Sequence, residues 1–154
     1  MDALASLRRR FRYHAWATAT LAGAVAASDA PDACRPLAHA VTADRVWLLR
    51  LRGEPTGGVA LWPDLDAPGC RALARRNADA YTDFLAGLED LVEAVAYETS
   101  GGEAHRTAIG DVLDHVLLHA AHHRGQVSAA LRAAGATPPV LDFVAWVRRG
   151  EPAA

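Results

Sequence analysis

Apolar residues recur at helical spacing over most of this 154-residue chain, and this periodicity constrains the fold more than any other feature. Side chains three and four positions apart share one face of an α-helix, so the pattern gives each helix a face to bury. It predicts helices over residues 3–27, 32–52, 68–95 and 108–134, and a short fifth helix over 140–149. These elements predict an all-α protein, an antiparallel four-helix bundle with a short extra C-terminal helix.

Glycine and proline mark the connections between the predicted helices. The segment from Gly53 to Gly69 is rich in both residues and predicts a long loop with room for a short strand. Gly101 and Gly102 separate two short segments, which predicts a small hairpin or an irregular loop. No internal repeat or linker divides the sequence, so residues 1–150 are expected to form a single domain.

The composition argues against several classes of protein. Hydrophobic residues make up 51% of the chain, which indicates a folded protein rather than a disordered one. The formal net charge of −2 disfavours nucleic acid as a partner, because phosphate binding requires a concentrated basic surface. No apolar run approaches the roughly 20 residues that span a bilayer, so we expect no membrane segment and a cytoplasmic location. Cys34 and Cys70 lack a short spacing, which favours packed side chains over a disulfide or a cysteine zinc site.

Two histidines interrupt the apolar face of the segment 108–134. Val112, Val116 and Val127 set the phase of this face, and the same phase includes His119 and His123. Burying an imidazole without a partner costs on the order of 2 kcal/mol, so both rings need one. Residues four apart on a helix have Cβ atoms about 5–6 Å apart, a spacing at which two imidazoles bind one metal ion from the same side.

A zinc-type site needs at least one further protein ligand. His39 lies among apolar positions of the second predicted helix and is the natural third ligand. We therefore predict that His39, His119 and His123 bind one divalent metal ion. A hydrogen-bonded pair of core histidines is the alternative. Ala120 stands where HExxH metalloproteases carry a glutamate general base, so peptide hydrolysis by that mechanism is disfavoured.

The remaining histidines carry weaker signals. His115 and His122 flank the predicted buried face, either as outer partners that orient a ligand or as solvated side chains. His14 and His105, in the first helix and in the loop before the fourth, receive no functional assignment.

Four segments of the chain resemble, in order and spacing, the DinB/YfiT-like family of metalloenzymes. They read FRYHAWATATL, LAHAVTADRVWLLRL, HVLLHAAHHRGQVSAALRAAGATPP and LDFVAWVRR, and together they span nearly the whole chain. The HxxxHHRGQ element is the most specific of them. The resemblance implies a four-helix bundle in which residues matching His39, His119 and His123 hold one metal ion, commonly zinc or nickel. Because family members often dimerise, it also implies a homodimer.

The family pattern includes further positions of this chain. Aromatic residues match Trp16 and Trp47, which we interpret as core packing. An RGQ sequence matches the residues that begin at Arg124, for which an ion pair at the surface or between helices is favoured over binding of a substrate carboxylate. A glycine inside a helix costs about 1 kcal/mol relative to alanine, so Gly125 predicts a close contact between helices.

Proteins similar to this chain include transferases that use low-molecular-weight thiols. A free thiol has a pKa of about 8.5, and coordination to a metal gives the thiolate at neutral pH. The resemblance therefore implies metal-dependent transfer of a low-molecular-weight thiol to an electrophile, with these two small molecules as partners. A metal-dependent hydrolase is one alternative. A non-catalytic, stress-associated metal-binding protein is another, and its site would be closed by a fourth protein ligand.

Overall fold

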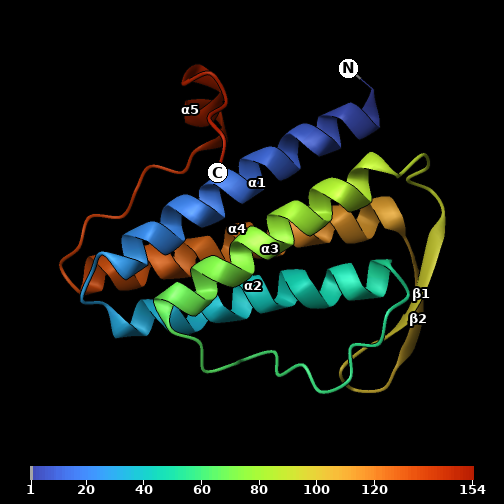
Figure 1. Cartoon of the computed structure of the whole chain (residues 1–154), viewed down its shortest axis with the longest axis horizontal. Helices are drawn as coiled ribbons and strands as arrows, with labels where there is room; N and C mark the ends of the chain where they lie inside the picture. The colour runs from blue at the N-terminus through green and yellow to red at the C-terminus, as the bar shows by residue number, and fades with distance from the viewer. Residues whose placement is uncertain (1) are drawn as a thin grey trace.

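The computed structural model describes residues 2–154 and is mostly helical (Figure 1). The helices are α1 (Ala3–Ala26), α2 (Pro31–Leu51), α3 (Ala67–Ala86), α4 (Ile109–Ala133) and the short α5 (Phe143–Arg148). Between α3 and α4, strands β1 (Ala94–Glu98) and β2 (Ala104–Ala108) form an antiparallel hairpin, with Ala94 opposite Ala108. The predicted helices and the predicted hairpin are confirmed, with one clear difference in length.

The third helix is shorter than its sequence pattern suggests. The periodicity predicts a helix to residue 95, but α3 ends at Ala86 and Gly87 is its C-cap. Leu88 and Leu91 lie beyond the helix and still pack against the buried cluster around Tyr81. Tertiary contacts half-bury both residues in the connection after the helix, so apolar residues at helical spacing continue where the helix has ended. The connection before α3 contains no strand within the described residues.

The helices do not simply alternate in direction along the chain. Figure 1 shows α1 and α4 running one way and α2 and α3 running the other. Side-chain contacts agree, since Asn77 donates to the carbonyl of Val41 and Tyr81 donates to the carbonyl of Asp44, so α2 and α3 advance together. Parallel neighbours cannot be joined by a tight turn, and the loop of residues 52–66 provides the long connection that returns the chain.

Two hydrophobic clusters fill the space between the helices. One includes Leu21, Leu37, Val41, Cys70, Val127 and Leu131, and the other includes Leu7, Phe11, Leu48, Tyr81, Leu113 and Val116. Each long helix has a buried polar residue between its contributions to the two clusters. These residues are His14 in α1, Asp44 in α2, Asn77 in α3 and Arg124 in α4. We call this set the polar layer. The protein thus has an apolar core that is divided by one band of polar groups.

The cysteines and Trp16 have the packing roles that the sequence predicts. Cys34 and Cys70 are both free thiols, Cys70 is fully buried, and both belong to or pack against the first hydrophobic cluster. Trp16 is buried and packs with Trp146 of α5. The C-terminal helix is therefore attached to α1 through an aromatic contact.

Local sequence signals set where the helices begin and end. Asp66 accepts a hydrogen bond from the backbone N–H of Gly69 at 2.7 Å, which caps the start of α3. After α4, Gly135 adopts a φ of 79°, and the N–H of Ala136 donates to the carbonyl of Leu131. This left-handed glycine satisfies carbonyls that the helix end leaves free.

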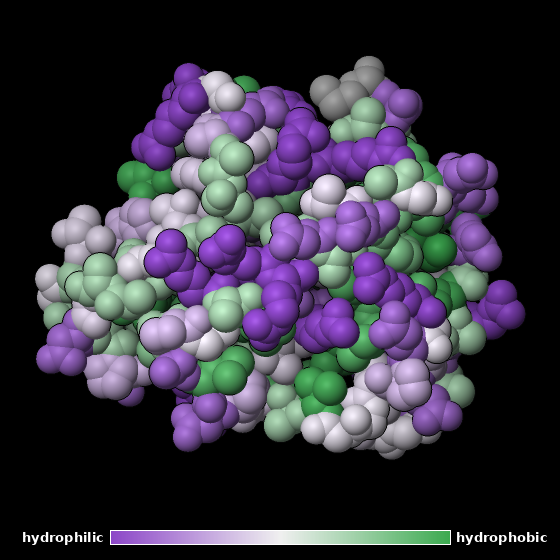
Figure 2. All heavy atoms as spheres, viewed as in Figure 1, coloured by the Kyte–Doolittle hydropathy of each residue, from purple (hydrophilic) through white to green (hydrophobic). Residues whose placement is uncertain are grey.

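The surface is polar over most of the face drawn in Figure 2, where hydrophilic side chains gather over α3 and apolar ones form smaller patches. None of the helices in residues 2–154 combines the length and the apolarity that a membrane span requires.

Gly125 does not mediate the close helix contact that the sequence predicts. A Cβ atom at this position would meet nothing within 4 Å, because the residue faces outward from α4. Gly110, at the start of the same helix, is the glycine in close contact, since a Cβ there would lie 3.1 Å from the carbonyl oxygen of Leu91.

These two glycines give opposite expectations for alanine substitution. Gly125→Ala should raise the free energy of unfolding by about 1 kcal/mol, because alanine stabilises an exposed helix position relative to glycine. Gly110→Ala should lower it, because the new methyl group collides with backbone. Urea unfolding followed by circular dichroism measures both, and a loss of stability in Gly125→Ala would contradict the open position found here.

Candidate metal centre

The side chains of His39, His119 and His123 meet between α2 and α4. One nitrogen atom from each ring lies within 4.8 Å of the other two, and the Nε2 atoms of His119 and His123 are 3.1 Å apart. Three nitrogens bound to one tetrahedral ion at 2.0–2.1 Å are about 3.4 Å apart, so small ring rotations suffice to bring all three to one ion. The structure thus brings together the three histidines that the sequence selects.

The three rings differ in exposure. His39 and His123 are buried, but His119 is only half-buried, at the edge of the inward face of α4. The sequence pattern places His119 on that face, whereas Ala120 occupies the core position, with an exposed fraction of 2%. His119 is therefore the ring of the cluster that borders solvent.

Hydrogen bonds fix the orientation of two of the rings. His39 Nδ1 lies 2.7 Å from the carbonyl oxygen of Leu61, and because a carbonyl only accepts, this nitrogen carries the proton. His123 Nδ1 lies 2.7 Å from Oε1 of Gln126. Both contacts leave the Nε2 lone pair directed away from its partner, which is the arrangement that metal-binding histidines use. Nδ1 of His119 is buried without a hydrogen-bond partner in the described chain.

The electrostatics of the cluster favour neutral imidazoles. Burial lowers the pKa of His119 to about 4, and the neighbouring His123 and His39 act in the same direction. Burial also lowers the pKa of His123. The carboxylate of Asp44 opposes both shifts, but more weakly than burial. Three neutral imidazoles offer nitrogen ligands that fit zinc, nickel, cobalt or iron.

The loop of residues 52–66 supplies a wall of the site that the sequence did not reveal. The indole of Trp62 stacks on the ring of His39 with centroids 3.9 Å apart and an interplanar angle of 11°. Trp62 is 53% exposed, and the guanidinium of Arg35 lies 5.5 Å from its ring centroid. A loop residue has no periodicity to indicate which way it points, so no sequence signal could have placed Trp62 on His39.

His115 and His122 both lie next to the ligand cluster while remaining exposed. The ring of His115 stacks on that of His119 with centroids 5.6 Å apart and lies 4.9 Å from Trp47. His122 Nε2 is 3.1 Å from Gln126 Nε2, and Gln126 in turn contacts His123. The ring of His122 also contacts that of His123 directly, with centroids 5.1 Å apart, so His122 borders the cluster both directly and through Gln126.

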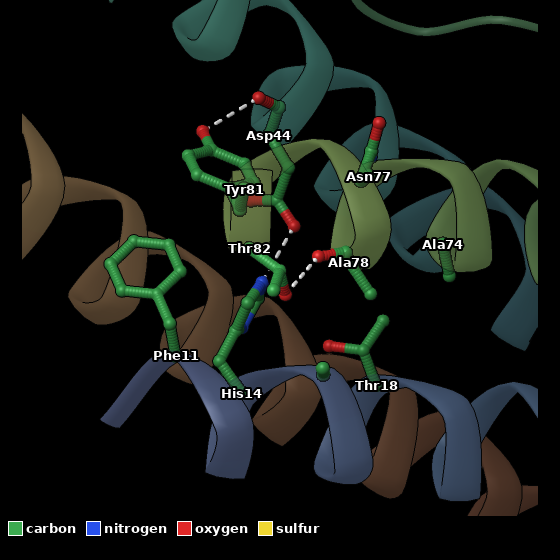
Figure 3. Close-up of a pocket in the computed structure, with 10 residues that line it drawn as sticks. Phe11, His14, Thr18, Asp44, Ala74, Asn77, Ala78, Tyr81 and Thr82 are labelled. Carbon is green, nitrogen blue, oxygen red and sulfur yellow. Dashed lines mark hydrogen bonds and ion pairs between the residues drawn. The ribbon is translucent and has the colours of Figure 1, made fainter. Parts of the chain in front are cut away.

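A second polar cluster lies behind the site, in the polar layer. Nη1 of Arg124 lies 3.0 Å from His14 Nδ1, and His14 Nε2 lies 3.0 Å from Oδ2 of Asp44. Figure 3 shows His14 of α1 pointing at Asp44 of α2, with Tyr81 of α3 alongside. Arg124 lies between helices as predicted, but within residues 2–154 it forms a hydrogen bond with His14 in place of the predicted ion pair. His14, which the sequence left without a role, joins the two charged side chains.

Hydrogen-bond roles determine the protonation of this cluster. Arginine only donates, so His14 Nδ1 accepts and its Nε2–H donates to Asp44. A neutral imidazole therefore separates a buried cation from a buried anion. The other carboxylate oxygen, Oδ1 of Asp44, is buried without a hydrogen-bond partner in the described chain, beside a cavity of about 20 Å³. A cavity of this size accommodates one water molecule.

Comparison with known proteins places the chain among relatives. The sequence model of the DinB family matches residues 15–151, a range that includes all three clustered histidines. The chain is 25% identical to Protein DinB of Bacillus subtilis (strain 168) over 121 residues, which cover 73% of this chain and 70% of that protein. A search of solved structures finds no significant match.

The buried Arg124–His14–Asp44 cluster should contribute strongly to stability. His14→Ala leaves a buried cation and a buried anion without their shared partner, so we expect the free energy of unfolding to fall by about 3 kcal/mol or more. Asp114→Asn is the control, because it removes an exposed pair with Arg10 and should cost less than about 1 kcal/mol. Equal losses for the two variants in urea unfolding would contradict this assignment.

Acid should destabilise the metal-free protein through His119. Its pKa is about 4 in the folded protein, against an ordinary value of 6.5, so the unfolded chain holds more protons between these two values. The stability contributed by the neutral ring is complete above pH 6.5 and is lost as the pH falls toward 4. We therefore expect the melting temperature to fall between pH 7 and pH 5, and to fall less in His119→Gln. Identical slopes for the two proteins would show that His119 does not titrate in this way.

Proposed function

The chain belongs to the DinB family, and on this premise we propose that it binds one divalent metal ion through His39, His119 and His123 and uses it to activate a low-molecular-weight thiol. The observation that carries the proposal is the convergence of three imidazoles, two of them held at their outer nitrogens by Leu61 and Gln126. Such outer hydrogen bonds set the tautomer and the orientation of a metal ligand.

We also infer that the four long helices constitute a four-helix bundle with one crossover connection. The contacts of α1 with α3 and α4, and of α2 with α3 and α4, support this arrangement. In such bundles, metal sites are built from side chains on facing helices, as the three histidines of α2 and α4 would be.

An open coordination position favours catalysis over a purely structural metal. Within residues 2–154, the cluster contains three histidines and no fourth histidine, cysteine or carboxylate. A structural site is typically closed by a fourth protein ligand, whereas a catalytic site leaves a position for water or substrate. The half-exposed His119 provides the side from which a small molecule would enter.

The bound ion would supply Lewis acidity that lowers the pKa of a thiol in the open position. The chain's own residues would orient the reaction. His39 and His123 would hold the ion through their Nε2 atoms, and Trp62 covers the face of His39, which shields this ring from solvent. The thiol sulfur would form a bond to an electrophilic carbon, the leaving group would depart with its bonding electrons, and the thiol proton would pass to solvent.

Metal content tests the first half of the proposal. Protein expressed without a histidine tag should contain about one zinc, nickel, cobalt or iron ion per chain by mass spectrometry, and His123→Ala should contain little, because one of three ligands is lost. His105→Ala is the matched control, since His105 lies on the hairpin beside Glu103 and should leave the metal content unchanged. If the wild-type protein contains no metal even after reconstitution, the three histidines are a hydrogen-bonded core cluster and the proposed metal site is wrong.

Thiol binding to cobalt-substituted protein tests the second half. A thiol that enters the open position should produce a sulfur-to-cobalt absorption band, and His39→Ala should not show it. If no thiol changes the spectrum but esters or phosphate esters are hydrolysed, the site is that of a hydrolase. A loaded protein that responds to neither would be a metal-binding protein without catalysis.

A further inference from the structure

Arg50 lies near the end of α2, the helix that also carries His39, and it has no anionic partner within residues 2–154. Its guanidinium lies 4.5 Å from the ring centroid of Trp47 and 5.2 Å from that of Tyr97 on β1. The side chain is half-buried, and its Nε atom has no hydrogen-bond partner within residues 2–154. It forms no ion pair there either, as is true of most arginines of the described chain, in which Arg9, Arg10 and Arg12 pair with carboxylates.

The geometry connects Arg50 to the metal centre through a short line of rings. His115 stacks on His119 with centroids 5.6 Å apart, and its other neighbour is Trp47 at 4.9 Å. The steps from Arg50 to Trp47, from Trp47 to His115 and from His115 to His119 are 4.5, 4.9 and 5.6 Å, so the guanidinium lies at most about 15 Å from the ring of His119.

The Nε atom of Arg50 is buried without a hydrogen-bond partner within residues 2–154, so an anion would have to meet the two terminal nitrogens. The N–H groups of these nitrogens match a carboxylate in a two-point contact. Burial lowers the pKa of Arg50, which reflects the cost of holding this cation away from water. His115, between Arg50 and the metal cluster, is exposed, so a small molecule can lie across it.

We propose that Arg50, framed by Trp47 and Tyr97, binds the anionic group of the molecule that occupies the open metal position. The ligand is then a small molecule with a metal-binding atom at one end and a carboxylate at most about 15 Å away. This assignment rests on the proposed function for the metal-binding end of the ligand. It adds the substrate class, because a neutral thiol of the same length lacks the group that Arg50 recognises.

Thiols that differ only in their far end test the assignment on cobalt-loaded full-length protein. The probes are the ω-thiol acid mercaptooctanoate, its neutral analogue mercaptooctanol and the shorter acid mercaptopropionate. Mercaptooctanoate should bind about tenfold more tightly than mercaptooctanol, as expected for one charge-assisted contact. Mercaptopropionate should lack this advantage because its carboxylate does not reach Arg50.

Variants of two arginines on the same helix locate the effect. Arg50→Gln should retain cobalt and bind mercaptooctanoate and mercaptooctanol equally, and Arg50→Lys should keep part of the preference because it keeps the charge. Arg35→Gln is the matched control, since Arg35 lies beside Trp62 on the other side of His39. An unchanged preference in Arg50→Gln, or a loss in Arg35→Gln instead, would overturn the assignment.

A readout that needs no thiol chemistry separates this inference from the proposed function. If no probe changes the cobalt spectrum, the same compounds are titrated against the protein while the indole N–H of Trp47 is followed by NMR. A shift caused by the acid but not the alcohol, and absent in Arg50→Gln, would support the anion site although thiol activation had failed. Without any shift, the anion site fails as well.

Discussion

The structure depends on a band of buried polar groups that the hydrophobic core has to accommodate. Arg124 of α4, His14 of α1 and Asp44 of α2 form a continuous hydrogen-bonded chain, and Tyr81 of α3 binds the backbone of Asp44. A helix that slid or rotated would leave a buried charge or a buried carbonyl without a partner, at a cost of several kcal/mol. Apolar side chains tolerate such sliding much better, because burial has no direction. The polar layer therefore fixes the relative positions of all four long helices.

The polar layer also determines the geometry of the candidate metal centre. His123 directly precedes Arg124 on α4, and His39 lies on α2 a little more than one turn before Asp44. The contacts that hold Arg124 and Asp44 in place thus also determine how far apart the histidines of α2 and α4 lie. His14 joins the charges of the layer on the α1 side, and the carboxylate of Asp44 acts on the pKa of His119 and His123. The inward side of α4 carries His123 and Arg124 among apolar residues, whereas His119 is half-buried.

The second determinant of the site is the long connection between α2 and α3. Because these helices are parallel, the chain has to return along the molecule, and the loop of residues 52–66 crosses the ligand cluster on the way (Figure 1). It contributes the carbonyl of Leu61 and the indole of Trp62 to His39. On the other side of the cluster, the hairpin brings Tyr97 to Arg50. The histidines thus lie between the loop and the hairpin, each of which places an aromatic side chain next to an arginine of α2.

The sequence by itself determined the helices and the identity of the clustered histidines. Helical periodicity depends only on local geometry, so it identified α1, α2 and α4 to within one or two residues, and the spacing of His119 and His123 required a common partner. It overextended α3, because Leu88 and Leu91 are half-buried by tertiary contacts and continue the helical spacing beyond the end of the helix. Only the tertiary structure decided that Trp62 covers His39, that His14 joins Arg124 to Asp44, and that Gly125 faces open space. Each of these depends on the rotation of a helix or the path of a loop, which are set by contacts between residues far apart in the chain and leave no periodic signal in the sequence.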